Sequence, residues 1–425
     1  MVRKIPEIKR DIPIDLRIKN HSSILVISKS QRYLTHVIHK YPAKFIPEYP
    51  RWSIKKYAGD TKNIILDPFS GSGTSNVEAK LAGYNSCAID VDPLARLLTK
   101  VKTTNLSEKK LDSERKRIEK QINKIKTHKK LPENFEIFKM WFRPQVAKQM
   151  SGLFEIIQKT ENSNIRNFLL ACFSSTIRRV SNADPKLVLP KISKFMRIEE
   201  EQGRTIDVQK TYLKFLNLYS EKIMEFSKLT KKSTKVKILG KDCRKINAED
   251  NTFSLAVTSP PYLNAHDYAR AHKLELFWLG MISNTDELKK LDQNYIGTER
   301  FLADEYCDIP TVGISELDKK IKKISKIDQK RGYIVSQFFL SMDTHFGEIH
   351  RTLKDGGHYV MFVGNNVVRG NVIPTHQYLS DLAKKNGLKT KLHFSSPLIK
   401  RMEVQAGRNK SGGFIPEDQV LVFKK

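Results

Sequence analysis

The sequence has few cysteines, and they are too far apart to suggest a disulfide framework or a metal site. It contains no Cys-x-x-Cys pair and no adjacent pair of histidines near a cysteine. Neither a set of cross-links nor a zinc site is therefore indicated. We expect buried, unreactive thiols at all four positions, which are Cys87, Cys172, Cys243 and Cys307.

Long apolar runs are also missing. No stretch approaches the ~20 consecutive apolar residues that a membrane-spanning helix needs. The first residues, Met-Val-Arg-Lys-Ile-Pro-Glu, lack the apolar core of a secretory signal. These two absences predict a cytoplasmic protein that has no membrane partner.

Acidic residues are scarce relative to basic ones. The 425 residues include 46 Asp and Glu against 76 Lys and Arg, which gives a formal net charge of +30. An excess of this size favours a polyanionic partner such as nucleic acid. The alternative is a lysine-rich composition in which the side chains are merely solvated.

Short apolar runs separated by helical patterns predict an α/β fold with a doubly wound parallel sheet. Seven runs are candidate strands: residues 63–66, 85–89, 236–239, 254–257, 359–363, 389–394 and 420–423. A short helix is expected near residues 52–57. No internal repeat with a period of 20–50 residues is present.

The spacing of these runs predicts a discontinuous catalytic domain, residues 36–102 and 235–425, that follows an N-terminal arm, residues 1–35. Residues 103–234 exceed what one strand crossover needs and show apolar residues at helical spacing, including Tyr212, Leu216 and Ile223. We interpret them as a helical insert that contacts DNA or recognises the target. Residues 281–332 form a second insert, a possible target-recognition loop, whose Lys-rich end is expected to be mobile.

A glycine-rich turn follows the first strand candidate. It reads Asp67, Pro68, Phe69, Ser70, Gly71, Ser72, Gly73, Thr74. No Lys follows the glycines, so the turn is not a triphosphate-binding loop. Glycine permits positive φ and a close approach of the backbone to a ligand. The acid at the strand end suits a cationic group such as an amino group.

Two further strand candidates also end in an acidic residue. Asp90 lies about twenty residues beyond the glycine turn, where a ribose diol would find an acceptor. Asp242 follows the third strand candidate and could accept a hydrogen bond from an adenine amine. Asp92 precedes Pro93 and suits the cap of a helix beginning there.

A second motif, Ser259-Pro260-Pro261-Tyr262, follows the candidate strand at 254–257. One reading is a polyproline ligand in a flexible segment. The flanks favour another reading, because a buried strand precedes the motif and a helical pattern follows it. A rigid Pro-Pro turn at a strand end can direct a polar side chain and an aromatic ring into one crevice.

The two motifs together resemble the S-adenosylmethionine-dependent DNA amino-methyltransferases, in the group that places the cofactor motif first. The resemblance covers the chain from about His36 to the last strand, apart from the two inserts. It implies a Rossmann-like seven-stranded sheet whose last strand pairs antiparallel. It also implies S-adenosyl-L-methionine as cofactor, bound by residues 67–74, Asp90 and Asp242, with Lys44 and Phe45 against its methionine end.

The resemblance assigns the chemistry to the Ser-Pro-Pro-Tyr motif. The Ser259 side chain and the Pro260 carbonyl would accept hydrogen bonds from the target amine, and Tyr262 would stack on a base rotated out of double-stranded DNA. Serine at this position favours cytosine N4, and adenine N6 is the alternative. No cysteine follows a proline, which excludes the nucleophile of cytosine C5 methylation.

The family context suggests a prokaryotic restriction-modification enzyme near the nucleoid, and a cognate restriction endonuclease that acts on the same site is a candidate partner. A basic nucleic-acid-binding protein with a relic catalytic core is the third reading. Polar residues near the motif, among them Asn264 and His266, could touch the target nucleotide or only cap a helix. Asn365 and Asn366 could line a base pocket or only form a turn.

Overall fold

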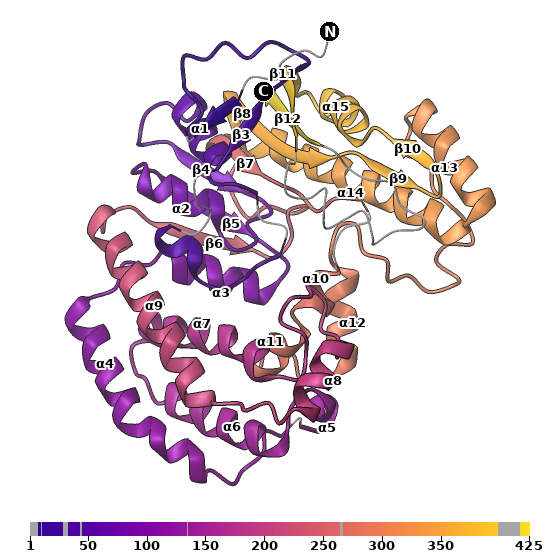
Figure 1. Ribbon diagram of the computed structural model, residues 1–425. Helices are drawn as coiled ribbons and strands as arrows, with labels where there is room; N and C mark the ends of the chain where they lie inside the picture. Colours follow the sequence, from indigo (N-terminus) through magenta and orange to yellow (C-terminus); the bar gives the residue numbers. More distant parts are fainter. Residues whose placement is uncertain are drawn as a thin grey trace.

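A central eight-stranded sheet organises the protein (Figure 1). The computed structural model describes residues 7–9, 11–28, 33–42, 45–133, 135–263, 267–397 and 417–425. The strand order across the sheet is β2-β11-β12-β8-β7-β4-β5-β6. The strands are β2 (Ser22–Ser23), β4 (Ile64–Asp67), β5 (Asn85–Ile89), β6 (Val236–Gly240), β7 (Phe253–Thr258), β8 (Leu353–Gly364), β11 (Lys389–Pro397) and β12 (Glu417–Lys424).

The direction of the strands confirms the expected fold class. Strands β6, β5, β4, β7 and β8 are paired in parallel, whereas β12 is antiparallel to both of its neighbours. The chain runs from β4 outward to β6 and then returns to β7 on the other side of β4. Ligands of open α/β sheets bind at such a reversal, beyond the carboxyl ends of the strands. The end of β4 and the end of β7 are therefore neighbours at the natural binding position.

All seven strand candidates are strands, and the differences lie at the edges. The dipeptide β2 adds an eighth strand through parallel pairing with β11. Two small two-stranded sheets also form, β1 (Glu7–Lys9) with β3 (Leu25–Ile27) and β9 (Asn366–Val368) with β10 (Asn371–Ile373). The described part of the N-terminal arm is packed, since Ile12, Ile24 and Val26 are buried.

Alternate residues of the strands face two different apolar layers. Leu255 and Val257 of β7 pack with the helix α1 (Glu48–Tyr57) and the arm. Ala256 between them belongs to the layer formed with α14 (Gln329–Thr352) and α15 (Thr375–Lys385). Helices on both faces explain why β7 is buried at every position.

Residues between β5 and β6 are mainly helical and form the lower part of the molecule in Figure 1. After α3 (Pro93–Lys102), they comprise α4 (Glu108–Gln121), η2 (Ile122–Thr127), α5 (Phe135–Phe138), η3 (Lys139–Trp141), α6 (Pro144–Gln158), α7 (Ser163–Val180), α8 (Lys194–Glu201) and α9 (Val208–Leu229). Their apolar side chains share a core with α11 (Lys273–Trp278), which follows the Ser-Pro-Pro-Tyr motif. This core joins the helical part to the region that follows the Ser-Pro-Pro-Tyr motif.

The segment proposed as a second insert is also ordered over its Lys-rich end. It contains α12 (Thr285–Gln293) and α13 (Ser315–Ile327) and runs into the start of α14. Leu317, Ile321 and Ile324 of α13 are buried, because the lysines alternate with an apolar stripe that packs on α14. The expectation of a mobile Lys-rich end was wrong for this reason.

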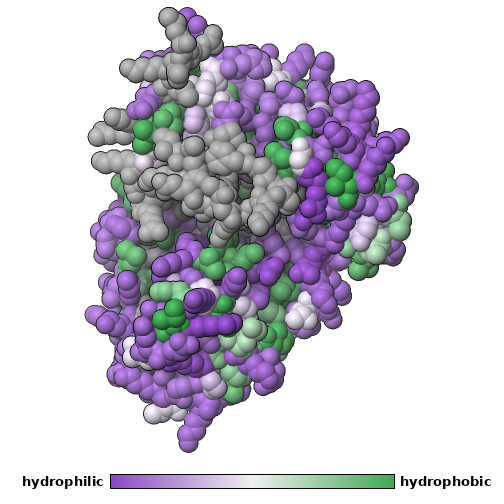
Figure 2. Space-filling model, turned by 45° about the vertical axis from the view of Figure 1, so that its right-hand side comes forward, coloured by the Kyte–Doolittle hydropathy of each residue, from purple (hydrophilic) through white to green (hydrophobic). Residues whose placement is uncertain are grey.

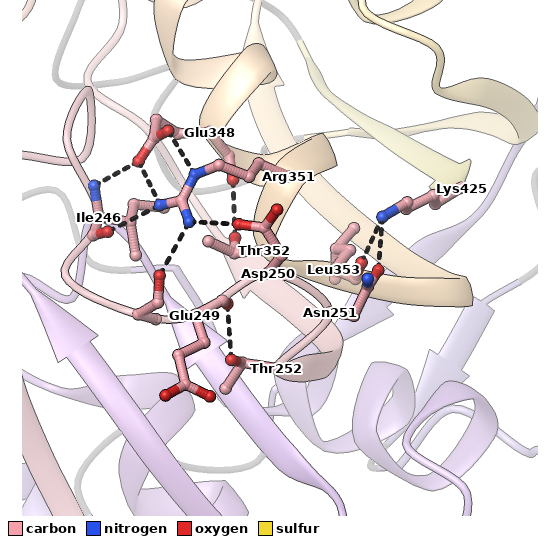
Figure 3. A network of polar contacts seen from close by, with 11 residues as sticks. Ile246, Glu249, Asp250, Asn251, Thr252, Glu348, Arg351, Thr352, Leu353 and Lys425 are labelled. Carbon is pink, nitrogen blue, oxygen red and sulfur yellow. Dashed lines mark hydrogen bonds and ion pairs between the residues drawn. The ribbon is translucent and has the colours of Figure 1, made fainter.

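A polar network fixes the loop between β6 and β7 to the end of α14 (Figure 3). The Arg351 guanidinium donates to Glu348, to Asp250 and to the carbonyl oxygens of Ile246 and Ala248. Lys425 donates to the Asn251 side chain and to the Leu353 carbonyl, at 2.7 and 2.8 Å. These contacts hold β7 and β8 in register at the end opposite the Ser-Pro-Pro-Tyr motif.

No helix within the described ranges is long and apolar enough to cross a membrane. Cys87, Cys172 and Cys243 are buried free thiols, as expected. Cys307 is exposed, contrary to the expectation, because it lies in the irregular segment between α12 and α13.

Candidate active site

The glycine-rich turn after β4 adopts a conformation that requires glycine. Gly71 and Gly73 have φ values of +50° and +83°. A Cβ atom on Gly73 would lie 2.9 Å from the Thr99 hydroxyl of α3. The helix α2 (Thr74–Leu81) can therefore begin directly beyond the turn and pack close to α3.

The turn lines a cavity at the carboxyl ends of β4, β5, β6 and β7. Most residues predicted from the two motifs and the two strand ends line it: Phe45, Pro68, Phe69, Ser70, Gly71, Ser72, Thr74, Asp90, Asp242, Ser259 and Pro261. These residues are widely separated in the sequence, and the strand order brings them together. The cavity thus joins the glycine-rich turn to the Ser-Pro-Pro-Tyr motif.

Four predicted residues do not line the cavity, and a fifth lies outside the described residues. Gly73 sits against α3, and Pro260 is buried. Asp67 is only 1% exposed and accepts a hydrogen bond from the Thr258 hydroxyl at 2.6 Å. The Tyr262 hydroxyl donates a hydrogen bond to Asp418. Lys44 is the residue that lies outside the described ranges.

Asp90 reaches the cavity from the end of β5. Its carboxylate accepts from the backbone N–H of Gly71 at 2.7 Å and from that of Asp92 at 2.9 Å. Burial, with the nearby charge of Asp92, raises the pKa of Asp90 to about 7. A ligand hydroxyl that donates to this carboxylate would favour its ionised form.

Asp242 lines the opposite part of the cavity and is paired with a neighbour. Arg244 donates to both of its carboxylate oxygens, at 2.8 and 3.0 Å. Burial acts to raise the pKa of Asp242, but the hydrogen bonds and charge of Arg244 hold it below its ordinary value. Asp242 is therefore ionised, and a ligand amine would share it with Arg244.

Three tyrosines form a wall of the cavity that the motifs did not reveal. The ring centroids of Tyr41 and Tyr268 are 6.2 Å apart, and those of Tyr268 and Tyr295 are 6.0 Å apart with nearly parallel planes. Tyr41 comes from the segment before α1, and Tyr295 from the second insert. Asn294 and Ile296 beside it also line the cavity, although no sequence pattern marks these three residues.

Side chains from other elements hold the Ser-Pro-Pro-Tyr loop in place. The Tyr262 hydroxyl donates to Asp418 of β12 at 2.7 Å. The buried Asn366 amide donates to the Leu263 carbonyl, and the Thr375 hydroxyl donates to the Asn366 oxygen at 3.1 Å. Asn366 therefore supports the loop from behind, while Asn365 accepts from His376.

The polar groups that line the cavity suit the chemistry of S-adenosylmethionine. The hydroxyls of Ser70 and Ser72 are buried and have no hydrogen-bond partner within the described structure. Buried polar groups are nearly always satisfied, so two orphan hydroxyls on one turn indicate a missing polar partner. Asp90 and Asp242 add acceptors for hydroxyl and amine groups, and Phe69 and Ile296 add apolar surface.

The fold is α/β, and the methyltransferases that resemble this chain support S-adenosyl-L-methionine as its cofactor. It is 27% identical over 402 residues to the type II methyltransferase M.MvaI of Kocuria varians, covering 86% of this chain and 84% of the relative. It is 26% identical over 405 residues to the type II methyltransferase M.BsoBI of Geobacillus stearothermophilus, covering 82% and 78%.

A search of protein-family models found no match. Among solved structures, a SAM-dependent methyltransferase from Methanosarcina mazei covers 87% of this chain and 94% of its own. Its sequence identity is 10% and its TM-score 0.30, which is too distant a likeness to carry an argument.

Proposed function

We propose that this chain is a type II DNA methyltransferase that methylates N4 of a cytosine rotated out of duplex DNA. The observation that carries the proposal is the position of Ser259 in the same cavity as the glycine-rich turn and Asp90. The type II methyltransferases that resemble the chain over most of its length support DNA as the substrate. The net charge of +30 suits that polyanion.

The reaction needs hydrogen-bond acceptors at the target amine. The lone pair of an exocyclic amine is delocalised into the base, so the nitrogen is a poor nucleophile until its protons are held out of the ring plane. The half-buried Ser259 hydroxyl and the carbonyl of buried Pro260 are the two acceptors. The fixed φ of two consecutive prolines keeps these acceptors in place before the base arrives.

Bound S-adenosylmethionine supplies an electrophilic methyl group. As the new nitrogen–carbon bond forms, the sulfur–carbon bond breaks and its electron pair stays on sulfur. The nitrogen then carries positive charge and loses its surplus proton to solvent. The chain contributes the acceptors for the target amine and the turn that holds the cofactor. Asp90 would accept from the ribose hydroxyls of the cofactor, and Asp242 would accept from its adenine amine.

The flipped base also needs an aromatic surface. We assign this role to Tyr262, whose ring is fixed by the hydroxyl contact with Asp418. Stacking of a base on an aromatic ring contributes about 1–3 kcal/mol. In a cell, the enzyme would protect the recognition site of a cognate restriction endonuclease.

Nucleoside analysis of methylated DNA tests the proposal. Unmethylated genomic DNA is incubated with the protein and S-adenosylmethionine carrying an isotope-labelled methyl group, then digested to nucleosides and examined by mass spectrometry. The proposal predicts label in N4-methylcytosine. Label in N6-methyladenine would support the related adenine reaction, which the same geometry permits. Cofactor binding without label in any base would indicate a nucleic-acid-binding protein with an inactive core.

A further inference from the structure

The loop before α8 and its first turns, residues 185–198, form a basic surface without acidic residues, which we call the α8 segment. It contains Lys186, Lys191, Lys194 and Arg197, and all four are exposed. Within the described structure, Lys191, Lys194 and Arg197 form no ion pair. Three acids follow the segment on α8: Glu200 is paired with Arg143 and Arg204, whereas Glu199 and Glu201 form no ion pair within the described structure.

The same surface exposes large apolar side chains. Phe195 and Ile198 of α8 are 43% and 40% exposed, and the neighbouring Ile137 and Met140 are 37% and 60% exposed. The Asn182 amide, three residues before the α8 segment, donates to the Met140 carbonyl at 3.2 Å. Clustered exposed apolar residues mark an interaction surface. Met196 on the same helix is buried, so the core fixes the orientation of α8.

The α8 segment lies beside the candidate active site. The Lys40 ammonium donates to the Pro185 carbonyl at 3.4 Å, and Lys40 directly precedes Tyr41 in the cavity wall. The Lys273 ammonium, at the start of α11, lies 4.3 Å from the centre of the Trp141 ring, next to Met140. In Figure 1, α8 and α5 lie together on the side that comes forward in Figure 2. The lower part of that face shows hydrophobic side chains among hydrophilic ones (Figure 2).

We infer that the α8 segment, with Ile137 and Met140, is the surface that contacts duplex DNA beside the flipped base and reads its sequence. This inference rests on the proposed function. The cations would bind backbone phosphates, while Phe195 and Ile198 would contact base edges such as the thymine methyl group. Charge favours DNA over a protein partner, because three exposed cations that form no ion pair in the described structure lie among the apolar side chains and complement a polyanion.

The test compares two variants with the same change in charge. K191A/K194A/R197A removes three cations from the α8 segment. K109A/K116A/K120A removes three exposed cations from α4, on the other side of the helical part in Figure 1. Binding of a fluorescent mixed-sequence duplex is measured at several KCl concentrations. Each lost phosphate contact lowers the slope of log K against log salt by about 0.9. In the α8 variant the magnitude of this slope should fall by up to about 2.7, and in the α4 variant it should hardly change.

A second variant tests sequence reading. F195A/I198A should keep the salt slope of the wild type but lower methylation of the preferred site roughly 10-fold relative to other sites, as sequencing of treated DNA would show. Unfolding temperature and S-adenosylmethionine affinity, both unchanged, show that the variants are folded.

The possible failures are distinguishable. If the wild type methylates DNA and both α8 variants match it, the α8 inference is wrong and the proposed function stands. If the wild type neither binds nor methylates DNA, the proposed function fails and the inference falls with it. If F195A/I198A turns an oligomer into a monomer by light scattering while DNA binding and site preference stay unchanged, the surface joins copies of the chain and the inference is overturned.

Discussion

His272 and Asp92 form a buried ion pair that connects the cofactor side of the cavity to the catalytic side. The His272 Nδ1 atom lies 2.6 Å from an Asp92 carboxylate oxygen, and both side chains are almost fully buried. Asp92 also caps α3 by accepting from the Leu94 N–H at 2.8 Å. The pair therefore fixes the end of β5 relative to α10 (Tyr268–Ala271) and α11.

Loss of His272 should destabilise the protein strongly. His272→Ala leaves the Asp92 charge buried without its partner, which costs about 3–5 kcal/mol. His272→Gln keeps a donor and should cost less. Denaturant unfolding of the two variants measures the difference. A His272→Ala protein as stable as the wild type would show that the pair contributes little.

The same pair predicts a pH dependence of stability. Burial acts to lower the pKa of His272, but the Asp92 charge raises it above the ordinary value. Burial acts to raise the pKa of Asp92, but His272 holds it below the ordinary value. The pair's contribution is thus fully present between the ordinary pKa of Asp and the ordinary pKa of His. It is lost as pH rises through the raised His272 pKa, and as pH falls through the lowered Asp92 pKa. His272→Gln should lose the alkaline part of this dependence in pH-resolved thermal unfolding.

Tyr262→Phe should separate two roles of one side chain. It keeps the stacking surface but removes the hydroxyl that donates to Asp418. We expect about 1 kcal/mol lower unfolding free energy and a modest fall in kcat, because the ring is less firmly held. Tyr262→Ala should weaken binding of duplex containing the target by about 1–3 kcal/mol. If the alanine variant binds and turns over like the wild type, Tyr262 does not stack on the base.

The sequence predicted the sheet well because strand runs and their end residues are local signals. The seven strands, the turn at Gly71 and Gly73, and the Asp92 cap all follow from short patterns. Contacts between distant segments have no such signal. The Tyr262 contact with Asp418 spans 156 positions, and the stack of Tyr41, Tyr268 and Tyr295 joins three separate segments.

Some contacts and elements of the structure differ from what short sequence patterns predict. The pairing of Asp242 with Arg244, two residues along the chain, is a contact that the strand-end pattern does not include. The two-residue β2 is too short to show any alternation, and only its pairing with β11 makes it a strand. The lysines of α13 suggested mobility although Leu317, Ile321 and Ile324 recur at helical spacing.

Asp90 should make cofactor binding depend on pH near neutrality. Its pKa is about 7 because it is buried beside Asp92, and ribose hydroxyls would donate to its ionised form. Affinity should therefore fall as pH drops below about 7, by up to roughly 10-fold per pH unit. Calorimetry between pH 5.5 and 8.5 measures the affinity for S-adenosylmethionine. Asp90→Asn is the control: its affinity should be weaker and should not change with pH. Equal wild-type affinity throughout that range would contradict the assignment.

The central claim, that Ser259 acts on the substrate in a cavity shared with the cofactor, is tested most directly by Ser259→Ala. Methyl transfer to saturating duplex DNA is measured in a single turnover, and S-adenosylmethionine affinity is measured on the same preparation. Loss of one acceptor that acts mainly in the transition state predicts a rate lower by roughly 10- to 1,000-fold. Cofactor affinity should be unchanged. A variant that transfers the methyl group at the wild-type rate would contradict the account.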